Sequence, residues 1–135
     1  SHKYHQQMVL PRSMRLKGHR CFDYLYKEGT RYNGSSMLLR VVSSKPNLLK
    51  VRHAETESNP LRCAISISNK VSKKAVKRNK LRRFFHFHLT KKLAKNTFKE
   101  NQWALLSLKP SSYNKSSLEL LNEFDHLLEK AGLVT

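Results

Sequence analysis

Acidic residues are scarce in this chain of 135 residues. Nine Asp and Glu stand against 27 Lys and Arg, so the formal net charge is +18, and no acid occurs from Ser58 to Lys99. Uncompensated positive charge of this size opposes folding through self-repulsion, which indicates a polyanionic partner. Nucleic acid fits better than a membrane surface or an acidic protein, because the charge is spread over a chain with the apolar content of a folded domain.

Other scarcities exclude several kinds of site. Cys21 and Cys63 form no CxxC pair and cannot make a zinc site alone, so we expect two buried free thiols, with a single disulfide left open. The four glycines are isolated, and the chain therefore has no glycine-rich phosphate loop. The few acids are scattered, which argues against a metal-dependent nuclease. His86 and His88 would point about 200° apart on a helix, so they do not form a metal pair.

No apolar run approaches the length of about 18 residues that would span a membrane. The N-terminus is polar and does not resemble a signal peptide. Two free thiols are typical of a reducing compartment. Together with the polar N-terminus and the lack of a long apolar run, they predict a cytoplasmic protein. The length suits one domain, at residues 11–135, and residues 1–10 are predicted to be a disordered tail or an artificial addition before a natural start near Met8.

Periodicity predicts the order helix, strand, strand, helix, strand, helix. Strands are expected at 37–42, 62–68 and 102–108, and a mobile connection over 43–60 has room for a short strand at 48–51. The first helix is short and ends at Gly29, the second runs over about 75–93, and the last begins at a Ser116–Glu119 capping box and ends at Gly132. This order predicts an α+β fold, a two-layer α/β sandwich with a mostly antiparallel sheet and a basic crossover helix.

The segment over 70–83, KVSKKAVKRNKLRR, carries eight Lys or Arg among its fourteen residues. Its apolar residues place it in a folded element. Helical spacing puts an apolar face against the core and a face with Asn79, Lys80 and Arg83 on the opposite side. Guanidinium groups beside an amide suit contacts to phosphate and sugar, so this helix is the candidate docking surface.

Phe22 and Tyr26 lie one helical turn apart on the first predicted helix. Both rings could belong to the core. The functional alternative is that they border a groove in which unpaired bases stack, with Ser66 and Ser68 on the polar face of the 62–68 strand as its floor. Stacking on such rings contributes about 1–3 kcal/mol per base and tolerates any sequence.

The chain resembles the protein subunit of bacterial ribonuclease P. AVKRNKLRR over 75–83 is similar to that family's Arg-Asn-Arg helix signature, and RLK at 15–17, FDYLYKEG at 22–29 and LKP at 108–110 fit in the same order. The resemblance covers roughly residues 11–128. Two departures are Lys80, where an Arg is usual, and Arg40, where the strand often carries an aromatic residue.

The resemblance implies a sandwich with a left-handed βαβ crossover, like a domain of a small-subunit ribosomal protein. It implies a non-catalytic subunit of an RNA-based endonuclease, inactive alone, whose RNA subunit removes the 5′ leader of precursor tRNA with Mg²⁺ held by the RNA. The implied partners are the catalytic RNA and precursor tRNA, with no membrane and no required protein partner.

The resemblance also assigns two sets of residues, and neither set is catalytic or metal-ligating. Contacts to the RNA subunit are expected from Lys74, Lys77, Arg78, Asn79, Lys80, Arg82 and Arg83. A cleft for the single-stranded leader is expected to be lined by Phe22, Tyr26, Arg40, Ser66, Ser68 and Lys70.

Three alternatives remain open at this point. A ribosomal or RNA-chaperone protein of the same broad fold would have the same composition but no dependence on a leader. A protein-only nuclease would cleave without added RNA and needs a carboxylate pair that the sequence does not reveal. A basic DNA-binding module would prefer duplex DNA.

Overall fold

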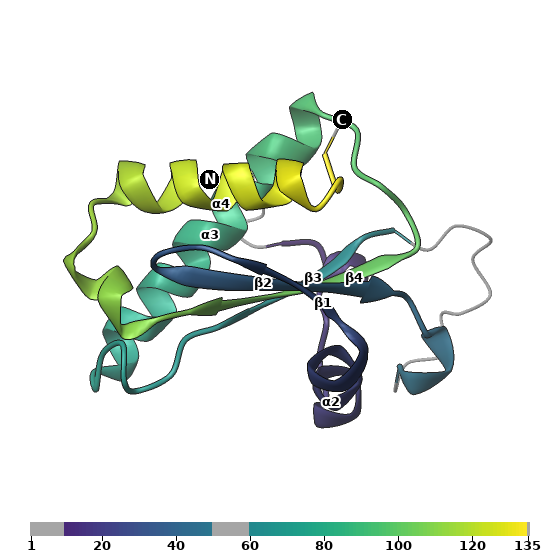
Figure 1. Ribbon diagram of the computed structural model, residues 1–135, viewed down its shortest axis with the longest axis horizontal. Helices are drawn as coiled ribbons and strands as arrows, with labels where there is room; N and C mark the ends of the chain where they lie inside the picture. Colours follow the sequence, from purple (N-terminus) through teal and green to yellow (C-terminus); the bar gives the residue numbers. More distant parts are fainter. Residues whose placement is uncertain (1–9, 50–59, 135) are drawn as a thin grey trace, which may run out of the picture.

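Figure 1 shows the computed structural model, which describes residues 10–49 and 60–134. Its four-stranded sheet has the order β1-β2-β4-β3. The strands are β1 (Thr30–Asn33), β2 (Met37–Ser43), β3 (Arg62–Ser66) and β4 (Gln102–Leu108). β2 pairs antiparallel with β1 and β4, and β3 pairs parallel with β4. The predicted α+β class and mostly antiparallel sheet are confirmed.

Helices lie on both faces of this sheet. α3 (Ala75–Lys95) and α4 (Ser117–Lys130) cover one face, and α2 (His19–Glu28) lies against the other (Figure 1). Three short 3₁₀ turns complete the described elements: η1 (Arg12–Met14), η2 (Pro46–Leu48) and η3 (Pro110–Asn114). The two expected layers are the sheet and the pair of helices α3 and α4. α2 lies on the opposite face of the sheet and covers part of it. α3 joins the parallel neighbours β3 and β4 as the expected crossover, whose hand stays a prediction.

β4 is buried on both faces, which explains its nearly unbroken apolar sequence QWALLSL. Side chains alternate across a strand, so Ala104 and Leu106 join the core beneath α3 and α4. Trp103 and Leu105 instead pack with α2. The same strand therefore anchors helices on opposite sides of the sheet.

α2 ends where the sequence predicts. The amide of Gly29 donates to the Leu25 carbonyl over 2.9 Å, and a Cβ at position 29 would collide with that carbonyl oxygen. Glycine is thus required here by close approach. The first turn of α4 forms the predicted capping box, in which Ser116 and Glu119 exchange hydrogen bonds.

Two expectations about strands were wrong in detail. β1 was not predicted, because its sequence TRYN is short and mostly exposed and forms a strand only through its hairpin with β2. The short strand considered at 48–51 would begin within η2, and residues 50–51 lie outside the described residues. Residues 1–9 of the predicted tail and most of the connection over 43–60 also lie outside them.

Glu123 on α4 holds the β1–β2 hairpin. One carboxylate oxygen accepts a 2.9 Å hydrogen bond from the Ser36 amide, and the other accepts from the hydroxyls of Ser35 at 2.9 Å and Ser36 at 2.7 Å. A Cβ at Gly34 would collide with this carboxylate. Partial burial raises the pKa of Glu123, but the hydrogen bonds from Ser36 and Ser35 outweigh it, and the net pKa lies below the ordinary value.

Replacing Glu123 with Gln should lower the free energy of unfolding by about 1–2 kcal/mol, since an amide NH₂ would face a donor at Ser36. Because the folded-state pKa is lowered, the carboxylate stabilises fully above its ordinary pKa, and this contribution disappears as pH falls through the folded-state value. Denaturant unfolding of both proteins from neutral to acidic pH checks this. The exposed Glu129 of the same helix, changed to Gln, is the control, and an equal loss there would contradict the role of Glu123.

Candidate nucleic-acid interface

The first half of α3 presents a basic surface, which we define as Lys74, Lys77, Asn79, Lys80 and Arg83, all exposed. The helix has no acid in its first turn and no side-chain cap at its N-terminus. The positive end of the helix dipole therefore adds to the lysine charges instead of being offset. Both effects favour an anion at this end of α3.

Arg78 and Arg82 differ from these exposed residues because the fold engages their guanidinium groups. Arg78 donates to the Ser72 carbonyl over 2.9 Å. Arg82 donates to the Asn79 side chain over 2.7 Å and reaches the Ile65 carbonyl of β3 over 3.4 Å. Arg82 therefore points toward the sheet edge rather than outward with Lys80 and Arg83.

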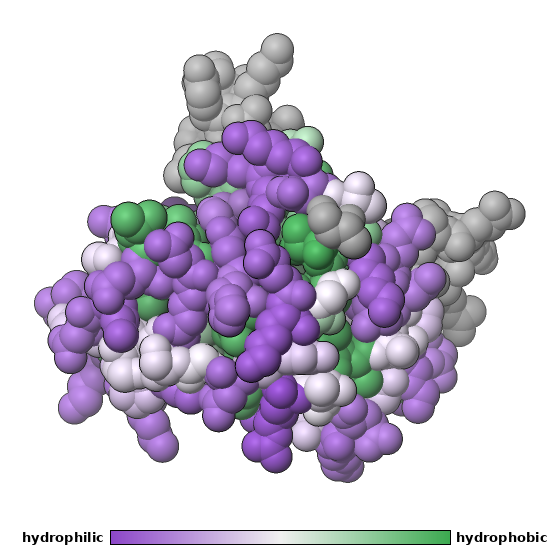
Figure 2. Space-filling model, turned by 45° about the horizontal axis from the view of Figure 1, so that its top comes forward, coloured by the Kyte–Doolittle hydropathy of each residue, from purple (hydrophilic) through white to green (hydrophobic). Residues whose placement is uncertain are grey.

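Viewed with the top of Figure 1 turned forward, hydrophilic residues cover most of the face that is seen (Figure 2). Apolar atoms show through only as small patches between them. Among the described residues, no helix is long and apolar enough to cross a membrane.

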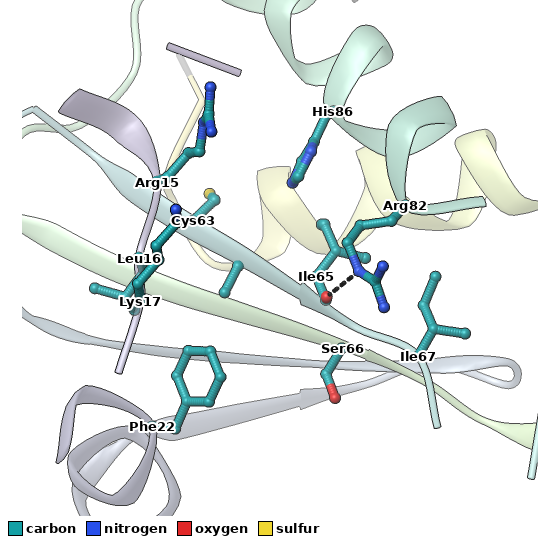
Figure 3. Close-up of a pocket in the computed structure, with 11 residues that line it drawn as sticks. Arg15, Leu16, Lys17, Phe22, Cys63, Ile65, Ser66, Ile67, Arg82 and His86 are labelled. Carbon is teal, nitrogen blue, oxygen red and sulfur yellow. Dashed lines mark hydrogen bonds between the residues drawn. The ribbon is translucent and has the colours of Figure 1, made fainter. Parts of the chain in front are cut away.

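A pocket of about 390 Å³ lies along β3, the edge strand of the sheet (Figure 3). The chain after η1 runs beside this edge, where the Leu16 amide donates to the Cys63 carbonyl over 3.0 Å. The pocket is lined by Arg15, Leu16, Lys17, Phe22, Cys63, Ala64, Ile65, Ser66, Ile67, Arg82 and His86.

A second pocket, of about 310 Å³, adjoins the first at Ser66, which lines both. We call the two together the cleft. The second pocket is lined by Tyr26, Leu38, Arg40, Ser66, Ser68, Ser107, Leu108 and Lys109. Phe22 and Tyr26, one turn apart on α2, thus face successive parts of the cleft.

Arg40 and Ser107 give the second pocket unusual polarity. The Arg40 guanidinium carbon lies 4.4 Å from the centroid of the Tyr26 ring, a cation–π contact. Arg40 Nε and Ser107 Oγ are buried and have no hydrogen-bond partner among the described residues. Such atoms cost free energy while they remain unpaired.

The imidazole of His86 and the thiol of Cys63 in the first pocket are held neutral. Burial, and then the charges of Arg15 and Arg82, lower the pKa of His86 to about 4. Burial raises the pKa of the Cys63 thiol to about 12. Cys63 and Cys21 are both buried free thiols, as the sequence predicted.

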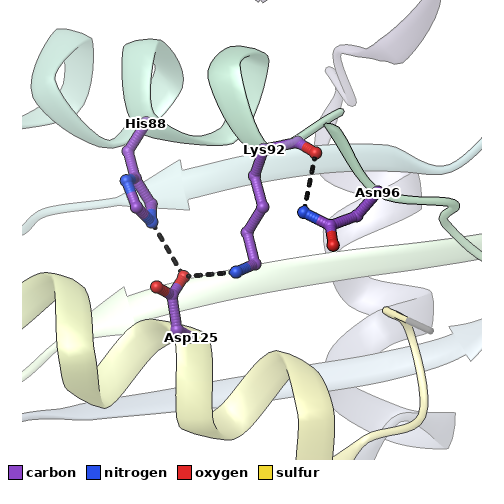
Figure 4. Close-up of polar contacts among 4 residues, drawn as sticks. All are labelled: His88, Lys92, Asn96 and Asp125. Atoms are coloured by element: carbon purple, nitrogen blue, oxygen red, sulfur yellow. Dashed lines mark hydrogen bonds and ion pairs between the residues drawn. The ribbon is translucent and has the colours of Figure 1, made fainter. Parts of the chain in front are cut away.

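His88 belongs to a different surface of α3. Its Nε2 lies 2.8 Å from an oxygen of Asp125 on α4, and Lys92 Nζ lies 3.4 Å from the same oxygen (Figure 4). The expected divergence of His86 and His88 is confirmed, since one lines the cleft and the other joins two helices. In the described part of the chain, no group of three His, Cys, Asp or Glu could hold a metal ion.

The structure brings together most of the residues expected in a cleft. Phe22, Tyr26, Arg40, Ser66 and Ser68 line it, whereas Lys70 is exposed and lies outside both linings. Arg82, expected to contact the RNA subunit, lines the cleft. Reasoning on the sequence did not assign Arg15, Lys17, His86, Ser107 and Lys109 to the cleft, because they come from segments that meet only across β3 and β4.

A family model described as Ribonuclease P matches residues 10–132. The chain belongs to the ribonuclease P protein family. It is 55% identical over 127 residues to the ribonuclease P protein component of Prochlorococcus marinus strain NATL1A, with 93% of this chain and 98% of the relative covered. Its identity to that of Synechococcus sp. strain WH7803 is 45% over 130 residues, with 93% and 98% covered.

Solved ribonuclease P proteins share this fold. The Staphylococcus aureus protein gives a TM-score of 0.69 at 20% identity over 90% of this chain and 98% of that one. The Thermotoga maritima protein in complex with 1-(4-fluorophenyl)-2-thiourea gives 0.67 at 16% identity over 84% and 96%. At this level of identity, the structural similarity shows only that the fold is shared. The shared fold agrees with the sandwich that the family resemblance implied.

Proposed function

We propose that this chain, as the protein component of the RNA-based endonuclease ribonuclease P, contacts two RNAs through two separate surfaces. The exposed basic surface of α3 meets the catalytic RNA, and the cleft holds the single-stranded 5′ leader of precursor tRNA. Cleavage of the leader matures the 5′ end of tRNA and is carried out by the RNA subunit. The protein acts in the cytoplasm, which suits its two buried free thiols.

The observation that carries this proposal is the separation of the two surfaces on one rigid frame. α3 directs Lys80 and Arg83 outward, while Arg82, on the same helix, turns to the edge of β3 and lines the cleft. Two polyanions brought together repel each other. Positive charge placed between them lowers that repulsion and so favours their joint binding.

The cleft suits an unpaired strand better than a duplex. Phe22 and Tyr26 offer ring faces for stacking, and the serines of β3 and β4 offer hydroxyl groups for sugar and phosphate. Stacking tolerates any base, and leaders differ in sequence, so this chemistry matches the substrate.

The Mg²⁺ of the reaction is assigned to the RNA. The acids on the described elements do not offer a cluster of carboxylates, which is the donor set that Mg²⁺ prefers. The described side chains that line the cleft include no carboxylate, the group that Mg²⁺ prefers as a protein ligand. This chain's part in the chemistry is therefore to bind and orient RNA.

Cleavage of a precursor tRNA with a 5′ leader by a bacterial ribonuclease P RNA, at low Mg²⁺ and with or without this protein, tests the proposal. We expect strong stimulation that requires the RNA subunit. Cleavage by the protein alone would indicate a protein-only nuclease. No effect on cleavage, combined with RNA binding that ignores the leader, would favour a ribosomal or chaperone role.

Changing Lys80 and Arg83 together to Gln should weaken binding to the RNA subunit and reduce the slope of log affinity against log salt by about 1–2, because each phosphate contact releases counterions. Filter binding over a series of salt concentrations measures the slope. The matched control changes Lys91 and Lys95 to Gln, which removes the same charge from the exposed C-terminal half of α3. An equal change in both double variants would show a general charge effect rather than a docking surface.

Tyr26→Ala should weaken binding of leader-bearing precursor tRNA by the holoenzyme by about 1–3 kcal/mol through lost stacking, and should leave mature tRNA unaffected. The ratio of the two affinities is the readout. Leu118, an exposed residue of α4 outside both pocket linings, serves as the control when changed to Ala. Equal losses of affinity for precursor tRNA and mature tRNA would contradict binding of the leader in the cleft.

A further inference from the structure

His86 faces the first pocket of the cleft between two guanidinium groups (Figure 3). Arg15 comes from the segment after η1, where its Nε donates to the Leu10 carbonyl over 2.6 Å. Arg82 lies one turn before His86 on α3 and reaches the β3 edge. Neither terminal nitrogen of Arg15 has a hydrogen-bond partner among the described residues, so its donors remain for a ligand.

Among the described residues, the charged groups that line the pocket beside His86 are all cationic. Arg15 and Lys17 come from the segment after η1, and Arg82 comes from α3 itself. Arg62 of β3 is close by and donates to the Arg15 carbonyl over 3.1 Å. Cys63, also of β3, is a neutral thiol because burial raises its pKa to about 12. No carboxylate lines this pocket, so nothing in its lining favours a protonated imidazole.

We propose that this pocket binds a phosphodiester of single-stranded RNA between Arg15, Arg82 and His86, and that His86 takes up one proton as the phosphate enters. The inference rests on the proposed function, in which the cleft holds the leader. In the free protein the imidazole is neutral at physiological pH, because its pKa lies at about 4. A phosphodiester carries one negative charge, so it partly offsets the two arginine charges, and one of its oxygens accepts a hydrogen bond from the imidazolium. Both effects favour the protonated imidazole against the burial and the repulsion that lower its pKa in the free protein.

Proton linkage determines whether binding becomes tighter or weaker as the pH falls. A group whose pKa is higher in the complex than in the free protein makes binding tighter as pH falls. For a bound-state pKa of about 7, one proton strengthens binding about tenfold between pH 8 and pH 6. Arginine and lysine contacts do not change charge in this range, so they contribute no such dependence.

The probe is a short oligouridylate, because uracil has no group that titrates between pH 6 and 8. Its affinity for the full chain is measured at pH 8 and pH 6 at constant ionic strength. Wild type should show the tenfold gain, and His86→Gln, which cannot take up the proton, should lose most of it. His126→Gln, an exposed histidine of α4, should retain the gain.

A second measurement does not depend on any variant. The imidazole pKa of His86, followed by NMR in wild-type protein, should rise from about 4 by about three units when oligouridylate is added. An unchanged pKa, an equal pH dependence in His86→Gln, or no binding of the oligouridylate would each overturn the inference.

Stimulation of precursor tRNA cleavage, measured on the same preparations at pH 8, keeps the two proposals apart. A protein that stimulates cleavage but binds without proton uptake refutes the role of His86 and leaves the proposed function standing. Failure to stimulate refutes the proposed function itself, whatever the pH dependence of binding.

Discussion

Burial of β4 on both faces is the constraint on which the rest of this structure depends. The strand lies between β2 and β3 and must be covered above and below, since its side chains alternate and nearly all are apolar. α3 and α4 cover one side and α2 covers the other. β3 lies at one edge of this strand order, and the pocket beside it is bordered by residues of both α2 and α3.

The same arrangement explains how one helix serves two surfaces. Phe85 and Leu89 of α3 are fully buried against the sheet, which fixes the rotation of the helix about its axis. Lys80 and Arg83 then face outward, and Arg82 and His86 face the edge of β3. Charge repulsion within α3 is tolerated because the apolar contacts beneath it hold the helix, and an RNA ligand would relieve that repulsion.

Away from the cleft, two sets of side-chain contacts join α4 to its neighbouring elements. Glu123 ties α4 to the β1–β2 hairpin, and Asp125 ties α4 to α3 through His88 and Lys92. Both sets of contacts use carboxylates of α4. Glu123 and Asp125 therefore bind groups within the fold, and neither lines the cleft.

The sequence by itself determined the class of the protein, three of the four strands, the three helices and the basic character of the exposed face of α3. These are local properties, set by periodicity, capping residues and charge density within single segments. Only the tertiary structure decided that Arg82 lines the cleft, that Arg15 and His86 converge there, and that Arg40 stacks on Tyr26. Their meeting depends on the strand order β2-β4-β3 and on which face each helix covers, because pairing between distant strands leaves no periodic signal in the segments it joins.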